Sequence, residues 1–418
     1  MIVKSQVAIL RTRPDTVVAD YGRLMRLMKY DQVLSRDVDL ILKLNLSWTK
    51  YFPACSSQPW QVDGVATTLL EDGYDRRRIF PVENKTVVTN PVVGCLNNRW
   101  YGVLERHGLS FTPLPDVEWT VHRFKSPLLK LNQIFPDGIE IPKMYVGKNV
   151  CHLPSVKTHG HSVTTGAIKN SFGGLLKEVR HYAHEFIHEV MVDLMYMQRE
   201  LHPAVFAVMD GTVMGDGAGP RTMIPREGNL ILASADQVAI DAMAAKLMGM
   251  DPLSIKFIRL AHERGLGCGD PRDIEIVGDE AAGAENWHFE GPFRKMTFAS
   301  RMQHKIYWGP WRKPIEWSLK TVLAPWAYAA SVVYHDSFWY PLKAKALMRD
   351  VLASPWGRLF RGWEETVADE NGYPDLGHES ADIQRTGLRA LVRSVGILGT
   401  CMKEAPEFAA RRRVQPTK

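Results

Sequence analysis

The sequence predicts an α/β fold, in which a mainly parallel sheet is flanked by helices and is followed by a helical extension. Up to about residue 290, short β-branched runs alternate with segments of helical periodicity, a pattern typical of α/β units. After about residue 300 the chain changes to long helix-like segments, which hold seven of the twelve tryptophans. We therefore expect an α/β core over residues 1–295 and a basic, tryptophan-rich extension or lid over residues 300–418.

The expected elements follow from these patterns. Strands are predicted over residues 3–10, 38–44, 78–82, 119–124, 150–156, 205–209, 229–233 and 274–277. Helices are predicted over residues 62–70, 91–106, 177–197 and 237–248. The last helix has the clearest limits, because Ser234 and Asp236 are capping residues before it and Gly249 follows its end.

Composition excludes several classes of protein. With 418 residues, 45% hydrophobic and 23% charged, the chain is neither a disulfide miniprotein, a coiled coil nor a disordered chain. The five cysteines are scattered, with no pair at two-residue spacing, so we expect no iron–sulfur cluster of its own and no zinc ribbon. The first residues predict a strand rather than a signal peptide. The longest uncharged apolar run, residues 321–334, is shorter than the roughly 20 residues of a membrane span, so we expect a cytoplasmic protein.

The net charge of +6 is unevenly placed. Residues 1–300 hold 34 basic and 34 acidic side chains, whereas residues 301–418 hold 18 and 12. The surplus therefore lies in the extension, which predicts a protein partner or a peripheral contact with a membrane surface there. No specific signal for nucleic-acid binding is present.

Histidines concentrate in one part of the chain. Seven of the fourteen fall within 51 residues: His152, His159, His161, His181, His184, His188 and His202. Imidazole is suited to proton transfer near neutral pH and to metal ligation. The cluster therefore predicts either a site for one of these roles or a group of structural histidines.

Polar residues next to the predicted strand at 150–156 suggest an anion site. Lys157 and His159 follow it directly, where open α/β sheets place ligand-contacting side chains. Lys169 and Asn170 lead into Gly173, where the backbone can approach a ligand closely. Lysines beside a glycine-rich turn favour carboxylate or phosphate. The alternative is surface lysines and a flexible turn.

A glycine-rich stretch follows the predicted strand 205–209. Asp210 stands at the strand end, as a carboxylate for a metal or a substrate or as a simple turn residue. Gly217 and Gly219 belong to a predicted tight loop whose N–H groups would bind an anion. Further on, Asp236 is expected to cap a helix, and Asp241 lies on a different helix face, where it could reach the crevice.

His184-Glu185-Phe-Ile-His188 matches the H-E-x-x-H pattern of zinc hydrolases. With His181, the two histidines would share one face of the predicted helix 177–197. The extended pattern needs a further histidine six residues on, where Leu194 stands. Histidines facing solvent on an amphipathic helix are the alternative interpretation. The candidate metal ligands are His159, His184 and His188, for a divalent ion.

Several motifs together resemble the bacterial and archaeal family catalogued as domain of unknown function 362. They are Lys43-Leu-Asn45, Lys157-Thr-His159, Thr165, Lys169-Asn170, Gly173, Arg180 with His184, Asp210-Gly211, Gly217-Ala-Gly219-Pro220, residues 233–242 and Gly265-Leu-Gly267. Leu44 replaces the family's proline. The similarity spans roughly residues 38–280. Some members look like iron–sulfur proteins with an added cysteine motif that this chain lacks. The resemblance implies roles for Arg180 and His184, and favours His184 over His188.

These observations give three hypotheses. The first is an enzyme acting on a small anionic metabolite by acid–base chemistry, such as isomerisation, elimination or assistance of a redox step. Its catalytic residues are Lys157, His159, Lys169, Arg180 and His184, and its substrate-binding residues are Lys43, Asn45, Asn170, Gly173, Asp210, Gly217 and Gly219. The second is a zinc hydrolase that uses His184, Glu185 and His188. The third is a non-enzymatic, membrane-associated or accessory binding protein that uses the aromatic and basic segment 307–340.

Overall fold

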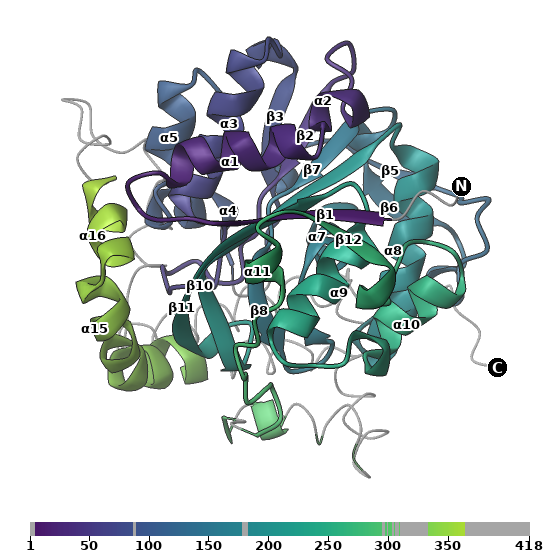
Figure 1. Ribbon diagram of the computed structural model, residues 1–418. Helices are drawn as coiled ribbons and strands as arrows, with labels where there is room; N and C mark the ends of the chain where they lie inside the picture. The colour runs from purple at the N-terminus through teal and green to yellow at the C-terminus, as the bar shows by residue number, and fades with distance from the viewer. Residues whose placement is uncertain are drawn as a thin grey trace.

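The computed structural model places helices on both faces of one mixed, mostly parallel sheet (Figure 1), which confirms the predicted fold class. It describes residues 5–86, 89–177, 183–294, 297–298, 300–302, 305, 309 and 333–363. Within them the strand order is β12-β1-β11-β10-β7-β2-β3-β4, while β8 pairs with β10 and β9 pairs with β8. The strands are β1 (Ser5–Arg11), β2 (Leu40–Lys43), β3 (Ile79–Glu83), β4 (Thr112–Pro113), β7 (Asn149–His152), β8 (Ser155–His159), β9 (Val163–Thr164), β10 (Val205–Ala218), β11 (Thr222–Ser234) and β12 (Ile274–Gly278).

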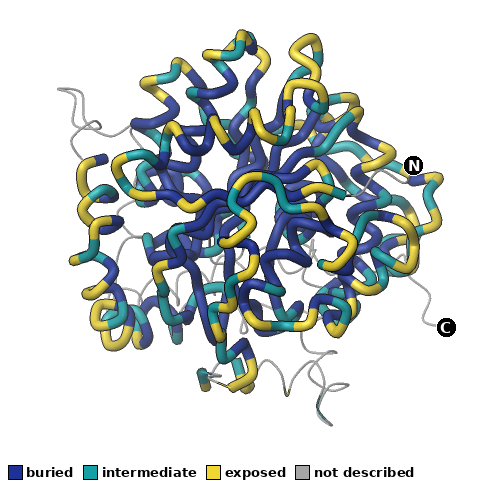
Figure 2. The backbone as a smooth tube through the Cα atoms, in the orientation of Figure 1, coloured by how far each residue is buried: buried dark blue, intermediate teal, exposed yellow. Residues whose placement is uncertain are grey.

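Two hydrophobic cores lie on opposite faces of this sheet. On β1, Val7 and Ile9 belong to one core, whereas Ala8 and Leu10 belong to the other, as the alternating side chains of a strand require. Figure 2 shows the buried backbone concentrated in the central sheet and the exposed backbone on the outer helices and loops. A sheet covered on both faces explains why its strands are almost continuously apolar in sequence.

The helices divide between the two faces. The core that contains Ala8 also takes residues from the first helices, and the core that contains Val7 takes residues from the later ones. The first group is α1 (Val17–Leu27), α3 (Pro59–Glu71), α4 (Pro91–Asn97) and α5 (Trp100–Arg106). The second group is α7 (Ala167–Leu175), α8 (Ile187–Leu201), α9 (Gln237–Leu247) and α10 (Lys256–Glu263). The short helices α2 (Tyr30–Val33), α6 (Leu131–Ile134) and α11 (Glu280–Gly283) belong to the same part of the chain.

The glycine-rich segment after residue 209 is not a loop, so that prediction is wrong. It is the second half of β10, which pairs antiparallel with β11 in a long hairpin. The register runs from Ala207 opposite Ser234 to Ala218 opposite Thr222. The backbone groups of this stretch therefore take part in a ladder rather than lining an open anion cradle. Because β11 is also antiparallel to β1, the sheet is mixed.

Other elements differ from the sequence expectations at their limits. The predicted strand 150–156 is divided into β7 and β8, because Pro154 lacks the N–H that a continuous ladder needs. The predicted helix 91–106 is divided into α4 and α5 at Arg99, whose φ is +64°. The predicted strand 119–124 is β5 (Trp119–His122), which pairs only with β6 (Ile139–Pro142) in a separate small sheet. The sequence also gave no prediction of α1, α7 or α10.

The described part of the C-terminal extension is helical and aromatic, as predicted. It comprises a helical segment Val333–Ala344, α15 (Lys345–Ala353) and α16 (Pro355–Gly362). In Figure 1, α15 and α16 lie beside the β10–β11 hairpin. The ring of Trp339 lies 5.9 Å from Trp48, and that of Trp356 lies 5.2 Å from Trp60, between centroids. None of the described helices combines the length and the apolar character needed to cross a bilayer.

Candidate functional site

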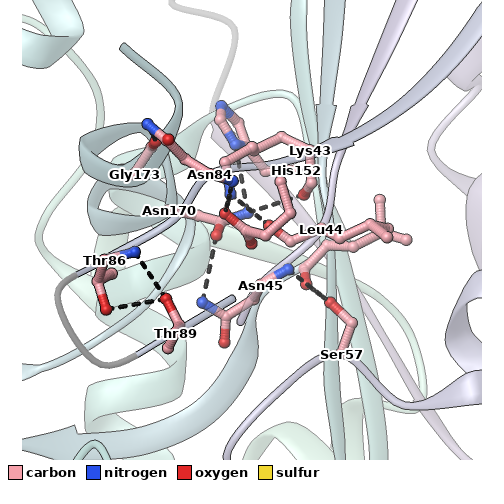
Figure 3. A network of polar contacts seen from close by, with 12 residues as sticks. Lys43, Leu44, Asn45, Ser57, Asn84, Thr86, Thr89, His152, Asn170 and Gly173 are labelled. Atoms are coloured by element: carbon pink, nitrogen blue, oxygen red, sulfur yellow. Dashed lines mark hydrogen bonds and ion pairs between the residues drawn. The ribbon is translucent and has the colours of Figure 1, made fainter. Parts of the chain in front are cut away.

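Polar side chains meet where β2, β3, β7 and β8 end, beside helix α7. The carboxyl ends of the parallel strands β2, β3 and β7 lie at one edge of the sheet, the place where α/β folds bind ligands. Figure 3 shows Lys43, His152 and Asn170 directed toward one another there. Lys43 and Lys157 are 1% and 0% exposed, so these lysines are buried in the protein rather than standing in an open crevice.

Lys43 forms a buried ion pair with Glu83. Its Nζ lies 2.8 Å from Glu83 Oε1 and donates a second hydrogen bond, 2.6 Å long, to the carbonyl of Leu44. The charge of Lys43 is therefore compensated inside the protein. Glu83 was not among the residues that sequence reasoning identified, since a single acid at a strand end has no motif around it.

An asparagine relay connects the two buried lysines. Asn170 Nδ2 donates to the carbonyl of Lys43 at 2.9 Å, and Asn45 Nδ2 donates to Asn170 Oδ1 at 3.3 Å. Asn45 Oδ1 in turn accepts from Lys157 Nζ. Lys157 also donates to the carbonyl of Cys55 at 2.7 Å. The structure thus brings together four of the predicted site residues, Lys43, Asn45, Lys157 and Asn170.

Burial lowers the pKa of Lys157 to about 8. The cause is loss of hydration of the ammonium, which the charge of Lys43 reinforces and the nearby Glu83 opposes. Lys157 therefore stays mostly charged at pH 7 but releases its proton more readily than an exposed lysine.

His159 has a defined hydrogen-bonding pattern. Its Nδ1 accepts backbone N–H groups from His161 at 3.1 Å and from Ser162 at 3.3 Å. The neutral ring therefore holds its proton on Nε2. Burial lowers the pKa of His159 well below its usual value, and the positive charges of Lys169 and Lys157 act in the same direction. His159 is consequently a neutral imidazole with one N–H donor.

Further imidazoles surround His159. The ring of His161 lies 5.6 Å from His159 and 5.7 Å from His184, between centroids. His184 packs on Phe172 of α7 at 5.3 Å, and Lys169 Nζ lies 5.7 Å from the centre of the same ring. The structure therefore groups His159, His184 and Lys169, and adds His161, which sequence reasoning counted only as part of the histidine-rich stretch.

A cavity of about 550 Å³ adjoins this group. Its wall comes from the turn between β8 and β9, the start of α8 and the start of α10. The lining residues are Gly160, His161, Val163, Glu185, Phe186, Ile187, His188, Glu189, Lys256 and Phe293. Its volume suits a small metabolite, and His161 connects its wall to His159.

The zinc-type motif does not lie on one helix, so that prediction is wrong. Helix α8 begins at Ile187, whereas His184 and Glu185 belong to the turn before it. The His188 ring instead stacks on Phe257 at 6.0 Å, and burial lowers its pKa to about 4. Arg180 and His181 lie outside the described residues. Within the described part of the chain, no three His, Cys, Asp or Glu side chains are grouped to hold a metal ion.

Asp210 is held by side chains of its own strand and of helices α1 and α3. It accepts hydrogen bonds from Tyr21 at 2.6 Å, Trp60 at 3.0 Å and Thr212 at 2.9 Å, and burial raises its pKa to about 6. All three partners belong to β10 or to the α1 and α3 face. The hydrogen-bond partners found for Asp210 include neither His159 nor His184.

At two of the predicted site glycines, the structure itself explains why the residue is glycine. A Cβ on Gly219 would overlap the carbonyl oxygen of Thr158, next to Lys157. Gly217 has φ +97°, a left-handed conformation that favours glycine. Gly173 lies nearer the lysines, since a Cβ there would meet Lys43 Nζ and Glu83 Oε1 at 3.7 Å.

The remaining histidine at the strand ends, His152, is structural. Burial lowers its pKa to about 3, so the ring is neutral. Its Nε2 is 2.7 Å from Gln198 Oε1, and its Nδ1 lies 3.5 Å from Asn170 Nδ2. It holds α8 and α7 against β7.

Comparison with known proteins agrees with the motifs quoted above. Part of the chain, 173 residues, is 28% identical to the Thylakoid-associated protein sll1697 of Synechocystis. This alignment covers 40% of the chain and 52% of the relative, so the chain spans about half of that protein's length. No solved structure matches the chain. Residues 40–246 match the family described as Domain of unknown function (DUF362), and they include the lysines, asparagines and histidines of the site. The chain belongs to this family.

Proposed function

We propose that the chain is an enzyme that transfers protons to or from a small anionic metabolite, at the group formed by His159, His161 and His184. One observation gives this proposal its strongest support. A cavity of about 550 Å³ has His161 on its wall, and His161 contacts both other imidazoles. After burial, the largest influences that lower the pKa of His159 come from Lys169, Lys157 and the neighbouring histidines. Such a surrounding favours an anion.

The residues divide into two roles in this proposal. His159, which is neutral and has its proton on Nε2, donates a hydrogen bond to a substrate oxygen. His184 exchanges the proton of the substrate's C–H or O–H group. Lys157 and Lys169 stabilise the negative charge that develops when a C–H or O–H group is deprotonated. The chemistry would serve isomerisation, elimination or assistance of a redox step. Arg180, which the family pattern pairs with His184, is a further candidate.

Hydrogen–deuterium exchange tests this reaction class without knowledge of the product. Purified protein is incubated in D2O with small carboxylates and phosphate esters, and loss of C–H signals is followed by proton NMR. Exchange of at least one compound is expected with the wild-type chain. It should fall at least 100-fold in His159→Gln, with a smaller loss in Lys169→Met.

His122→Gln is a matched control, because His122 is partly exposed and contacts Glu200 away from the site. Equal exchange in wild type and His159→Gln would remove the assignment. Elemental analysis of the same preparation separates this chemistry from a zinc hydrolase. About one zinc per chain, with an inactive His188→Ala variant, would favour the hydrolase instead.

A second candidate function is peripheral binding to a membrane. Phe338 and Leu342 are 53% and 70% exposed and lie four residues apart, on one side of the helical segment that contains them. Lys343 and Lys345 follow them. Exposed apolar side chains beside lysines are typical of interfacial helices, and the Synechocystis relative is described as thylakoid-associated.

Flotation with vesicles tests this second function. Vesicles of phosphatidylcholine with 30% phosphatidylglycerol should carry the wild-type chain upward in the gradient, and vesicles of phosphatidylcholine alone should carry less. The double variant Phe338→Ser, Leu342→Ser should stay at the bottom. Absence of wild-type flotation with anionic vesicles would end the proposal, and equal flotation of the variant would end the role of these two residues.

A further inference from the structure

The cavity beside the histidines has apolar and aromatic side chains in its wall. Among the described residues that line it, these are Val163, Phe186, Ile187 and Phe293. They come from β9, from the start of α8 and from the segment that follows α11. Cavities of several hundred Å³ that combine apolar walls with a few polar groups are the usual sites of organic ligands. The wall therefore suits an organic body rather than an inorganic ion.

The position of Phe293 in this wall is set by a buried carboxylate. Asp216 on β10 is 1% exposed, and its two oxygens accept the backbone N–H groups of Glu290 and Gly291, each at 3.0 Å. Arg226 pairs with the same carboxylate at 2.9 Å. Phe293 follows Gly291 by two residues and is 50% exposed. Its ring is thus held at the cavity with surface that a ligand can cover.

His188 adds a flat, uncharged ring to the same wall. It stacks on the fully buried Phe257, with 6.0 Å between the ring centroids and 20° between the ring planes. Burial lowers the pKa of His188 to about 4, so its ring is neutral at pH 7. Aromatic rings pack favourably on one another in offset or edge-to-face arrangements. The rings of this wall therefore favour a planar ring in the ligand over a flexible chain.

The charged groups of the wall do not attract an anion. Lys256 forms an ion pair with Glu189 at 2.6 Å, and Glu185 adds a second carboxylate to the lining. Two acidic residues against one lysine give the described lining no positive surplus. The anionic group of a ligand is therefore expected at the histidines, on the side of His161, and its uncharged part along the rest of the wall.

We infer that the cavity binds the aromatic ring of a substrate that carries a carboxylate or phosphate group, and that Phe293 and His188 contact this ring. The inference rests on the proposed function in one respect, that the anionic end of the substrate lies at the histidine group. His161 connects the two parts, because it lines the cavity and its ring lies 5.6 Å from that of His159. The substrate class is thereby narrowed from small anions to aromatic acids.

Calorimetric titration with methylphosphonate and phenylphosphonate tests this inference, because the two probes carry the same anionic group. The wild-type chain is expected to bind phenylphosphonate about tenfold more tightly, through burial of the ring. Phe293→Ser should weaken phenylphosphonate binding about fivefold, and Phe293→Leu should weaken it less, because it keeps an apolar contact. Phe298→Ser is the matched control, since Phe298 is 69% exposed and is not among the described lining residues. Its affinity should equal that of wild type.

Several results would overturn the inference. They are equal affinity of wild type for the two phosphonates, no binding of phenylphosphonate at millimolar concentration, and unchanged phenylphosphonate affinity in Phe293→Ser. Tighter binding of aminomethylphosphonate than of phenylphosphonate would also overturn it, in favour of a positively charged body.

The same probes separate this inference from the proposed function. His159→Gln should keep the preference for phenylphosphonate, because both probes lose the same contact at the anionic end. Proton exchange without a preference for the phenyl group would remove this inference alone. A preference for the phenyl group without proton exchange in any compound would remove the proposed function and leave an aromatic binding site.

Discussion

The carboxylate of Asp241 caps a helix to which it does not belong, and Gly166 leaves the room that it occupies. Asp241 lies on α9, and its oxygens accept the backbone N–H groups of Ala167 at 2.6 Å and Ile168 at 3.1 Å, at the start of α7. A Cβ on Gly166 would overlap Asp241 Oδ1. Because α7 contains Lys169 and Asn170, α9 sets the position of these two site residues.

A double-mutant cycle tests this contact. Gly166→Ala should lower the free energy of unfolding by about 1–3 kcal/mol through steric overlap, and Asp241→Ala by about 1–2 kcal/mol through loss of the cap. The double variant should lose less than the sum, since the new methyl group then has space. Urea denaturation of the four proteins measures the coupling. Simple additivity would contradict the contact.

The stability of the protein should depend on pH through Asp241. Burial raises the pKa of this carboxyl to about 7, against an ordinary value of 3.8. The folded protein then holds the proton more tightly than the unfolded chain. The stability that this proton contributes is complete below about pH 4 and is lost as the pH rises through about 7.

The Asp241→Asn variant removes this dependence, because the amide does not ionise. Between pH 4 and pH 7.5 its free energy of unfolding should fall by about 2–4 kcal/mol less than that of wild type. Denaturation at half-unit pH intervals provides the measurement. Burial raises the pKa of Asp210 to about 6. In both proteins Asp210 therefore contributes a smaller decrease in the free energy of unfolding as the pH rises. Parallel curves for the two proteins would contradict the prediction.

The Lys43–Glu83 ion pair should behave as a buried pair. Glu83→Gln removes the negative charge that Glu83 places beside the buried Lys43 ammonium and should lower the free energy of unfolding by about 3–5 kcal/mol. Adding Lys43→Met to this variant should recover most of the free energy of unfolding that Glu83→Gln loses. Lys143→Met provides a surface comparison, because the side chains of Lys143 and Glu118 are 62% and 67% exposed, and it should cost under about 1 kcal/mol. No restoration in the double variant would show that Lys43 has a second structural role.

His159 should remain neutral over the ordinary working range of pH. Two backbone N–H groups bind its Nδ1, and burial with nearby lysines keeps its pKa well below the usual value. Nitrogen-15 NMR of the histidine side chains should therefore show one ring with the proton on Nε2 and no change from pH 8 to pH 5.5. His262→Gln assists assignment by removing one other resonance. Titration of the His159 ring near pH 6.5 would contradict its burial.

The sequence predicted the strands and the site residues near them better than it predicted how they are connected. Runs of β-branched residues located β2, β3, β10 and β12, because such runs are the direct signature of buried strands. It could not show that the stretch after Asp210 continues as a strand, since glycines in a hairpin and glycines in a loop look alike. Pairing with β11 is what distinguishes a strand from a loop here, and β11 is formed by a later part of the chain.

The site was accessible to sequence reasoning only where motifs marked it. Lys157, His159, Lys169 and Asn170 stand in a compact pattern after a predicted strand. Glu83 and Cys55 stand alone in the sequence and reach Lys43 and Lys157 only through tertiary contacts. Asp241 was noticed as a carboxylate on a different helix face, but its partner lies 74 residues earlier, a distance that local spacing does not reveal.

The hydrogen bond between Trp48 and Asp336 joins positions 288 residues apart, and this separation bears on how the protein matures. Trp48 stands in the connection between β2 and α3 that also holds Asn45 and Cys55. During synthesis the N-terminal part of a chain emerges and begins to fold first. The connection between β2 and α3, which supplies the contacts of Asn45 and Cys55 with Lys157, therefore obtains this support only after most of the polypeptide has been made. A nascent chain that stops before residue 336 would contain all the strands of the described sheet, but its connection between β2 and α3 would lack the hydrogen bond from Trp48.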